Sequence, residues 1–328
     1  MLKKLQYEFF TTKNIKPKGW LKEQLKVQAA GLNGNLDKVW PDVRDSAWIG
    51  GNRDSWERVP YWLDGFIPLA YLLEDEDMIA RVKKYIDAII GFQKEDGWIC
   101  PCADNERGNY DLWAVSLILK VLTVYADCSG DERIPEVLEK CLKQFDTFLN
   151  GNTLKNWGAA RWFECLIPIF WLYSRTHEEW LIMLAKKMQM IGFDWTKILG
   201  FIDSCTDKWG FQYGWNQYSH VVNVAMMLKS EALISLMSDE NPTEFTEKML
   251  DYLEKNHGNA VGYFNGDETL SGRLPINGTE LCGVVEAMYS YEWLFAVTGD
   301  KKWLDKLEKL AYNSLPAAIS PDMWTHQY

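Results

Sequence analysis

Long uncharged runs, clusters of basic residues and paired cysteine motifs are all missing from this chain of 328 residues. No stretch approaches the roughly 18 uncharged residues that a membrane-spanning helix needs, which argues against a membrane-spanning protein. The formal net charge of −11, without clustered Lys and Arg, argues against binding to nucleic acid or to anionic membranes. A neutral or cationic partner is expected instead.

The N-terminus lacks the parts of a secretory signal. Residues 1–10 are basic, but they contain no apolar run of signal-peptide length and no small-residue cleavage site. We therefore expect a cytoplasmic protein.

Cysteine is present but scattered. Seven cysteines show no paired CxxC spacing, so neither a structural zinc site nor a disulfide scaffold is predicted. Cys128, Cys141 and Cys165 fall within helical patterns and are expected to be buried thiols. Cys282 alone has acidic neighbours at a predicted helix start.

The chain is instead rich in tryptophan, with 17 residues, and in helical periodicity. An apolar helix, a short acidic turn and an amphipathic helix recur along the sequence. Five such pairs and an amphipathic stretch at 18–30 predict an all-α fold, an (α/α)6 toroid, incomplete or just closed, without substantial β-sheet, in one domain over residues 1–328. The predicted pairs are 60–73 with 78–93, 112–125 with 134–149, 162–173 with 178–191, 221–237 with 244–255, and 280–297 with 302–315.

Unusual polar and aromatic residues precede the first helix of each pair, so they are expected on one rim of the toroid. Aromatic rings can stack on sugars, and carboxylate, imidazole and amide groups can bind sugar hydroxyls. His220 could equally cap a loop, and any one Trp could simply fill the core. The candidate substrate-binding residues are Trp56, Asp111, Trp157, Trp215, Tyr218, His220 and Asn223.

Carboxylates and a thiol gather in Gly266-Asp-Glu and Gly278-Thr-Glu-Leu-Cys. Glycoside hydrolysis needs a proton donor and a second group that attacks or activates water. Glu280 lies at a predicted helix start, where the helix dipole favours the ionised carboxylate, with Thr279 as the expected N-cap. Glu280 and Cys282 diverge on a regular helix, so joint metal binding requires an open or extended first turn. The pattern is equally consistent with no chemical role, in which Glu280 is an ordinary carboxylate at a helix start and Cys282 is a buried thiol.

Several motifs in order resemble glycoside hydrolase family 127, the β-L-arabinofuranosidase-like family, over nearly the whole chain. They are Ile15-Lys-Pro-Lys-Gly-Trp-Leu, Val39-Trp-Pro-Asp-Val, Ser55-Trp-Glu-Arg-Val-Pro-Tyr-Trp-Leu-Asp-Gly, His220-Val-Val-Asn-Val-Ala-Met, Gly266-Asp-Glu and Gly278-Thr-Glu-Leu-Cys.

The resemblance implies a catalytic toroid followed by β-sandwich domains, and a retaining hydrolase with a zinc-bound cysteine nucleophile. It implies Glu268 as the acid/base, Glu280 and Cys282 as part of the zinc site, and His220 as a substrate contact. The family's two further cysteines, the nucleophile among them, lie downstream of the matched motif, and no cysteine follows Cys282 here. We therefore expect a truncated toroid without the β-sandwich domains. We expect it to lack the cysteine nucleophile and to bind zinc weakly or not at all, which makes hydrolytic activity of this short chain doubtful.

The leading hypothesis is a β-L-arabinofuranosidase-like hydrolase acting on plant-type arabinose-containing glycans. One alternative is a carboxylate-only toroid such as an unsaturated uronyl hydrolase, with Asp111 and Asp267 as its acids. Another is a non-catalytic glycan-binding domain. A homo-oligomer is left open.

Overall fold

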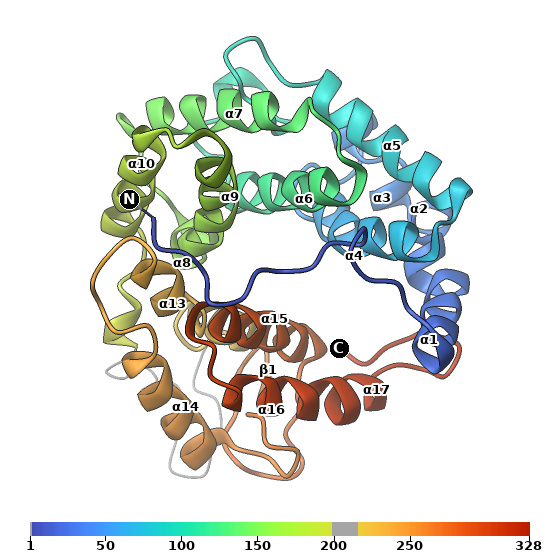
Figure 1. Ribbon diagram of the computed structural model, residues 1–328, viewed down its shortest axis with the longest axis vertical. Coiled ribbons are helices and arrows are strands. Elements are labelled where there is room, and N and C mark those ends of the chain that lie inside the picture. The colour runs from blue at the N-terminus through green and yellow to red at the C-terminus, as the bar shows by residue number, and fades with distance from the viewer. Residues whose placement is uncertain (1, 199–215) are drawn as a thin grey trace. The chain divides into compact units, whose positions relative to one another are not determined.

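The computed structural model describes residues 2–198 and 216–328, which fall into two compact units. The N-terminal unit comprises residues 10–191 and 321–324. The C-terminal unit comprises residues 1–9, 192–320 and 325–328. Regular structure in the described residues is almost entirely helical, which confirms the predicted all-α class (Figure 1).

The N-terminal unit is built from packed helix pairs. Helices α4, α6 and α9 contact one another in sequence order, and α5, α7 and α10 each pack against their partners in the chain (Figure 1). Its elements are α1 (Gly19–Ala30), α2 (Leu32–Val39), α3 (Pro41–Arg44), η1 (Ala47–Ile49), α4 (Arg58–Leu73), α5 (Glu76–Gly91), η2 (Asp104–Glu106), α6 (Trp113–Ser129), α7 (Ile134–Leu149), α8 (Asn156–Ala160), η3 (Trp162–Cys165), α9 (Leu166–Thr176) and α10 (Glu179–Ile191).

The difference between the two helices of a pair follows from their sequences. Helix α6 is apolar nearly all round, and almost every residue from Trp113 to Cys128 is buried. Helix α7 buries only one stripe, including Leu138, Leu142 and Phe145, and turns its charged residues to solvent. Cys128, Cys141 and Cys165 are buried free thiols, as predicted. Helix α1 forms as expected, but none of its residues is buried.

The C-terminal unit holds the remaining helices and a two-stranded hairpin. Helix α15 packs against α12, α13 and α16. The elements are η4 (Trp195–Lys197), α12 (Val221–Met227), α13 (Ser230–Ser235), α14 (Glu244–His257), β1 (Gly266–Asp267), β2 (Thr269–Leu270), α15 (Leu281–Thr298), α16 (Lys302–Lys309), η5 (Leu310–Ser314) and α17 (Leu315–Ala317).

The helix predicted over 221–237 is in fact two helices, because tertiary hydrogen bonds take carbonyls that the helix would use. The Ser290 hydroxyl donates to Ala225 O at 2.7 Å, and the Thr246 hydroxyl donates to Leu228 O at 3.0 Å. The helix predicted over 302–315 is also interrupted, by the π turn η5. Pro316 follows that turn, and proline offers no N–H to a regular α-helix.

Across residues 2–198 and 216–328, no helix combines the length and apolar character that crossing a membrane requires.

Candidate active site

Glu268 lies at the tip of the β1–β2 hairpin, where Gly266 pairs with Leu270 and Asp267 pairs with Thr269. Its φ of 64° is in the left-handed region, which costs a non-glycine residue about 1–2 kcal/mol. Hydrogen bonds hold this backbone in place. The Glu268 N–H donates to Glu280 Oε2 at 3.0 Å, and Val221 N–H donates to Glu268 O at 3.0 Å. A strained residue fixed by its surroundings is typical of a functional site.

His220 faces the Glu268 side chain. His220 is the N-cap of α12, and its Nδ1 accepts from the Asn223 N–H at 3.2 Å. In the neutral ring the proton then belongs on Nε2, which lies 3.5 Å from Glu268 Oε2. The ring is buried, whereas half of the Glu268 side chain is exposed. The arrangement therefore orients a solvent-reachable carboxylate.

The other atoms of Glu268 and Asn223 have defined partners as well. Glu268 Oε1 accepts a hydrogen bond from the Tyr328 hydroxyl, which raises the pKa of that phenol. Asn223 is fully buried, and its amide nitrogen donates to Gln217 O at 3.0 Å and to Gln217 Oε1 at 2.7 Å. Asn223 thus anchors the segment that precedes His220.

Glu280 and Cys282 are brought together at the start of α15. The helix begins at Leu281, and Glu280 is its extended N-cap with φ −61° and ψ 128°. Glu280 lies outside the helix, where the neighbouring Cys282 thiol favours the ionised form of its carboxylate. Thr279 is not the N-cap that was predicted. Its hydroxyl instead donates to Asn265 Oδ1 at 3.2 Å.

The ionisation predicted for Glu280 is wrong in direction. Burial raises the pKa of this carboxyl and outweighs the N–H of Glu268 and the thiol of Cys282, which favour the ionised form. The negative charges of Glu268 and Asp267 raise it further. Burial therefore outweighs the position at a helix start in setting the direction of the pKa shift, because only 3% of Glu280 is exposed.

The described residues do not by themselves fit a catalytic zinc ion. Within residues 2–198 and 216–328, no three His, Cys, Asp or Glu side chains gather closely enough to hold a metal. Glu280 and Cys282 supply two donors, and Glu280 Oε2 already accepts the Glu268 N–H. Catalytic zinc sites generally keep three protein ligands. Glu280 and Cys282 therefore make up at most part of such a site.

Three predicted substrate-binding residues lie together in the N-terminal unit. Asp111 Oδ1 accepts from the N–H groups of Trp113 and Gly158 at 3.0 and 2.9 Å, and Oδ2 accepts from Trp157 N–H at 3.1 Å. Trp56 Nε1 donates to Asp111 O at 3.3 Å. Burial raises the pKa of Asp111 even though three N–H groups favour its ionised form. Asp111 ties the start of α6 to α8.

Asp111→Ala is expected to lower the free energy of unfolding by about 2–4 kcal/mol, because three backbone N–H groups lose their acceptor. Urea unfolding followed by circular dichroism measures the loss. Asp111→Asn keeps one acceptor oxygen and is expected to lose less. An alanine variant as stable as the parent chain would contradict this role.

Tyr218 and Trp215 are the remaining predicted substrate-binding residues. Tyr218 stacks on Phe193 at 5.1 Å between ring centroids and meets Trp195 edge-on at 5.4 Å. It therefore belongs to an aromatic cluster of the C-terminal unit. Trp215 lies outside the described residues.

Tyr263 was not among the residues singled out from the sequence. Its buried hydroxyl has no hydrogen-bond partner among the described residues. That oxygen lies 3.0 Å from where a Cβ on Gly283 would be, in the first turn of α15. Burial raises the pKa of the phenol, and the neighbouring Tyr291, Glu280 and Glu286 raise it further. A glycine inside an otherwise bulky predicted helix was the only available signal.

Comparison with known proteins assigns the chain to a family. The sequence profile of the β-L-arabinofuranosidase GH127 catalytic domain matches residues 13–328. The chain belongs to this family. No curated protein sequence matches this GH127 chain.

Solved structures share the fold at low identity. A GH127 β-L-arabinofuranosidase from Geobacillus stearothermophilus T6 aligns with a TM-score of 0.70 and 16% identity, covering 96% of this chain and 57% of that one. A protein described as a glycoside hydrolase aligns with a TM-score of 0.64 and 14% identity, over 94% of this chain and 51% of its own. The GH127 chain thus spans little more than half the length of these relatives.

An unsaturated glucuronyl hydrolase from Streptococcus agalactiae also aligns, with a TM-score of 0.62 and 10% identity, over 100% of this chain and 89% of that one. Both kinds of neighbour are α/α toroids, so the predicted fold class is confirmed.

Proposed function

We propose that this GH127 chain is a glycoside hydrolase that cleaves β-L-arabinofuranosides in plant-type glycans. The observation that carries the proposal is the Glu268 carboxylate, held at the tip of a strained hairpin with His220 Nε2 3.5 Å from Oε2. A solvent-reachable carboxylate with fixed geometry suits proton transfer to a leaving oxygen and later from water.

Each residue of the site has a proposed task. Glu268 acts as the acid/base, and His220 orients it and contacts a substrate hydroxyl. The N–H of Glu268 is fixed by Glu280, so the hairpin tip cannot shift without breaking that bond. Glu280 and Cys282 would supply two of the ligands of the zinc site that the resemblance to the family implies. The group that attacks the anomeric carbon is left unassigned among the described residues.

The likeness to an unsaturated glucuronyl hydrolase favours a second candidate, in which carboxylates alone do the chemistry. Its candidates are Asp111 and Asp267. Asp111 accepts three backbone N–H groups, so its oxygens are occupied by structural bonds. This argues against Asp111 as the acid of a uronyl hydrolase and leaves Asp267 as its candidate.

Two assays on the purified chain separate the candidates. Release of nitrophenol from an aryl β-L-arabinofuranoside is the expected result. Loss of the 4,5-unsaturated uronate chromophore, without arabinoside cleavage, would replace the proposal with the uronyl hydrolase. If the chain binds arabinose-containing oligosaccharides but cleaves neither the arabinoside nor the unsaturated uronate, the proposal would be replaced by a glycan-binding domain.

A further inference from the structure

A cavity of about 540 Å³ lies between α1, α2 and the start of α5 in the N-terminal unit, and we call it the α1–α5 cleft. Its volume is typical of small-molecule sites. Four cations and two carboxylates line it, namely Lys22, Lys26, Lys38, Arg81, Asp75 and Asp77. The fold gathers these cations from separate parts of a chain whose net charge is −11, and the proposed reaction uses none of them.

The Arg81 guanidinium is held in one orientation by several contacts. Its Nη1 donates to Asp37 Oδ1 at 2.7 Å and to Gly34 O at 3.0 Å. Its Nε donates to Asp77 Oδ2 at 3.0 Å, and the group lies 4.9 Å from the centre of the Phe66 ring. Nη2 donates to no atom of residues 2–198 and 216–328. Arg81 therefore presents one preorganised N–H donor group to a ligand in the cleft.

Two exposed lysines of the cleft, Lys22 and Lys38, form no ion pair within the described part of the chain. Lys38 Nζ donates to the neutral amide oxygen of Asn35 at 3.2 Å. Lys22 is near Glu74, but that carboxylate pairs with Lys16 at 2.7 Å, and Lys16 lowers its pKa more than Lys22 does. We call Lys22 and Lys38 the cleft lysines, and their charges are available to an anion.

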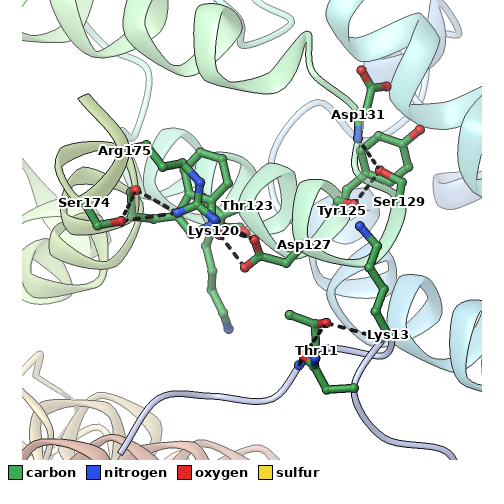
Figure 2. A network of polar contacts seen from close by, with 12 residues as sticks. Thr11, Lys13, Lys120, Thr123, Tyr125, Asp127, Ser129, Asp131, Ser174 and Arg175 are labelled. Carbon is green, nitrogen blue, oxygen red and sulfur yellow. Dashed lines mark hydrogen bonds and ion pairs between the residues drawn. The ribbon is translucent and has the colours of Figure 1, made fainter. Parts of the chain in front are cut away.

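Cations elsewhere in this unit pair directly with a carboxylate. Arg175 Nη2 donates to Asp127 Oδ1 at 2.9 Å (Figure 2). Lys120 Nζ donates to Asp64 Oδ2 at 2.8 Å. Each of these charges is compensated within the protein, so little attraction is left for an anion from solvent. The cleft lysines differ from them in this respect.

The two carboxylates of the cleft narrow the class of anion. Asp75 is the N-cap of α5 and accepts the Met78 N–H through Oδ1 at 2.9 Å, and 75% of the Asp77 side chain is exposed. A phosphate dianion offers these carboxylates no donor and is repelled by them. A polyhydroxy acid instead brings hydroxyl donors for the carboxylates together with a carboxylate for the cations. The chemistry of the cleft therefore favours an acidic sugar.

We propose that the α1–α5 cleft binds a uronate sugar. Its carboxylate accepts from Arg81 Nη2 and from the cleft lysines, and its hydroxyls donate to Asp75 and Asp77. Local charge decides this site, although the net charge of the chain repels anions at long range. The inference concerns the N-terminal unit alone and goes beyond the reaction proposed for Glu268.

The test measures the Kd of digalacturonate by titration calorimetry on the full chain. Neutral galactobiose of the same linkage is expected to bind at least about tenfold more weakly, because it lacks the carboxylates. The double variant Lys22→Gln/Lys38→Gln is expected to raise the Kd of digalacturonate about 5- to 25-fold, since each exposed charge pair contributes up to about fivefold. Lys83→Gln/Lys186→Gln removes two exposed charges that do not line the cleft and is expected to leave Kd unchanged.

A spectroscopic readout places the ligand and checks the fold. Met78 lines the cleft and is 3% exposed. Its methyl signal, assigned through Met78→Leu, is expected to shift when digalacturonate is added to the parent chain, and the same spectrum shows whether the double variants are folded. Equal Kd values for the two double variants, galactobiose binding as tight as that of digalacturonate, tighter binding of inorganic phosphate, or an unshifted Met78 signal overturns the proposal.

The cleft and the proposed function can fail separately. Digalacturonate binding that depends on the cleft lysines, in a chain that hydrolyses no arabinoside, supports the cleft and rejects the function. Arabinoside hydrolysis by a chain that binds no digalacturonate supports the function and rejects the cleft.

Discussion

Replacing Glu268 with glutamine is expected to lower kcat/KM for an alkyl β-L-arabinofuranoside by about 10²- to 10⁴-fold, the usual contribution of a general acid/base. Glutamine is nearly isosteric and can still accept from Tyr328, but it has no proton to transfer. The His220 Nε2 contact at 3.5 Å and the fixed backbone remain available to hold it. The fold should be unchanged by circular dichroism.

Asp267→Asn is the matched control, because Asp267 is the adjacent carboxylate in the same hairpin and is exposed. It is expected to change kcat/KM less than about threefold, as for a surface group outside proton transfer. A large loss in Asp267→Asn with a small loss in Glu268→Gln would reverse the assignment. That result would favour the carboxylate-only alternative, for which Asp267 is a candidate acid.

Gly266→Ala is expected to lower the free energy of unfolding by about 1–3 kcal/mol, the usual cost of overpacking. A Cβ at this position would lie 2.5 Å from Val221 Cγ2 and 2.6 Å from Val221 Cβ. Valine is stiff at χ1, so the clash cannot be relieved by a rotamer change. Val221 follows His220, and the hairpin carries Glu268. The substitution should therefore push the acid/base away from the imidazole and lower activity as well.

Gly278→Ala is the control for this prediction. A Cβ there would meet Asp267 Cβ at 3.4 Å, an ordinary contact, so a change in stability within about 0.5 kcal/mol is expected. Urea unfolding of the two variants measures both effects. Equal stability of Gly266→Ala and Gly278→Ala would contradict the close packing of the hairpin against α12.

Local pattern was sufficient to predict most helices. The apolar run that forms α6 predicts a helix buried on all sides, and the amphipathic run that forms α7 predicts a helix with one buried stripe. The break between α12 and α13 was not predictable, because the Ser290 and Thr246 hydroxyls that cause it come from distant positions. Tertiary hydrogen bonding overrode helix propensity there.

The sequence predicted the two motifs of the candidate site, Gly266-Asp-Glu and Gly278-Thr-Glu-Leu-Cys, but not how they pair with each other. Gly266 and Thr279 form a parallel bridge, with Gly266 N–H donating to Gly278 O and Glu280 N–H donating to Gly266 O. This pairing joins the two motifs and turns the Glu280 carboxylate toward the Glu268 backbone. It depends on loop conformation between the motifs, about which hydrophobic periodicity carries no information.

The central claim, that Glu268 transfers a proton to the departing oxygen, is tested most directly by the leaving-group dependence of kcat/KM. The measurement compares the parent chain and Glu268→Gln on a 2,4-dinitrophenyl and a methyl β-L-arabinofuranoside. A dinitrophenolate leaves without protonation, so the variant should cleave that glycoside nearly as well as the parent and lose about 10²- to 10⁴-fold only on the methyl glycoside. Equal losses on both substrates would contradict the account, because a structural defect does not distinguish between leaving groups.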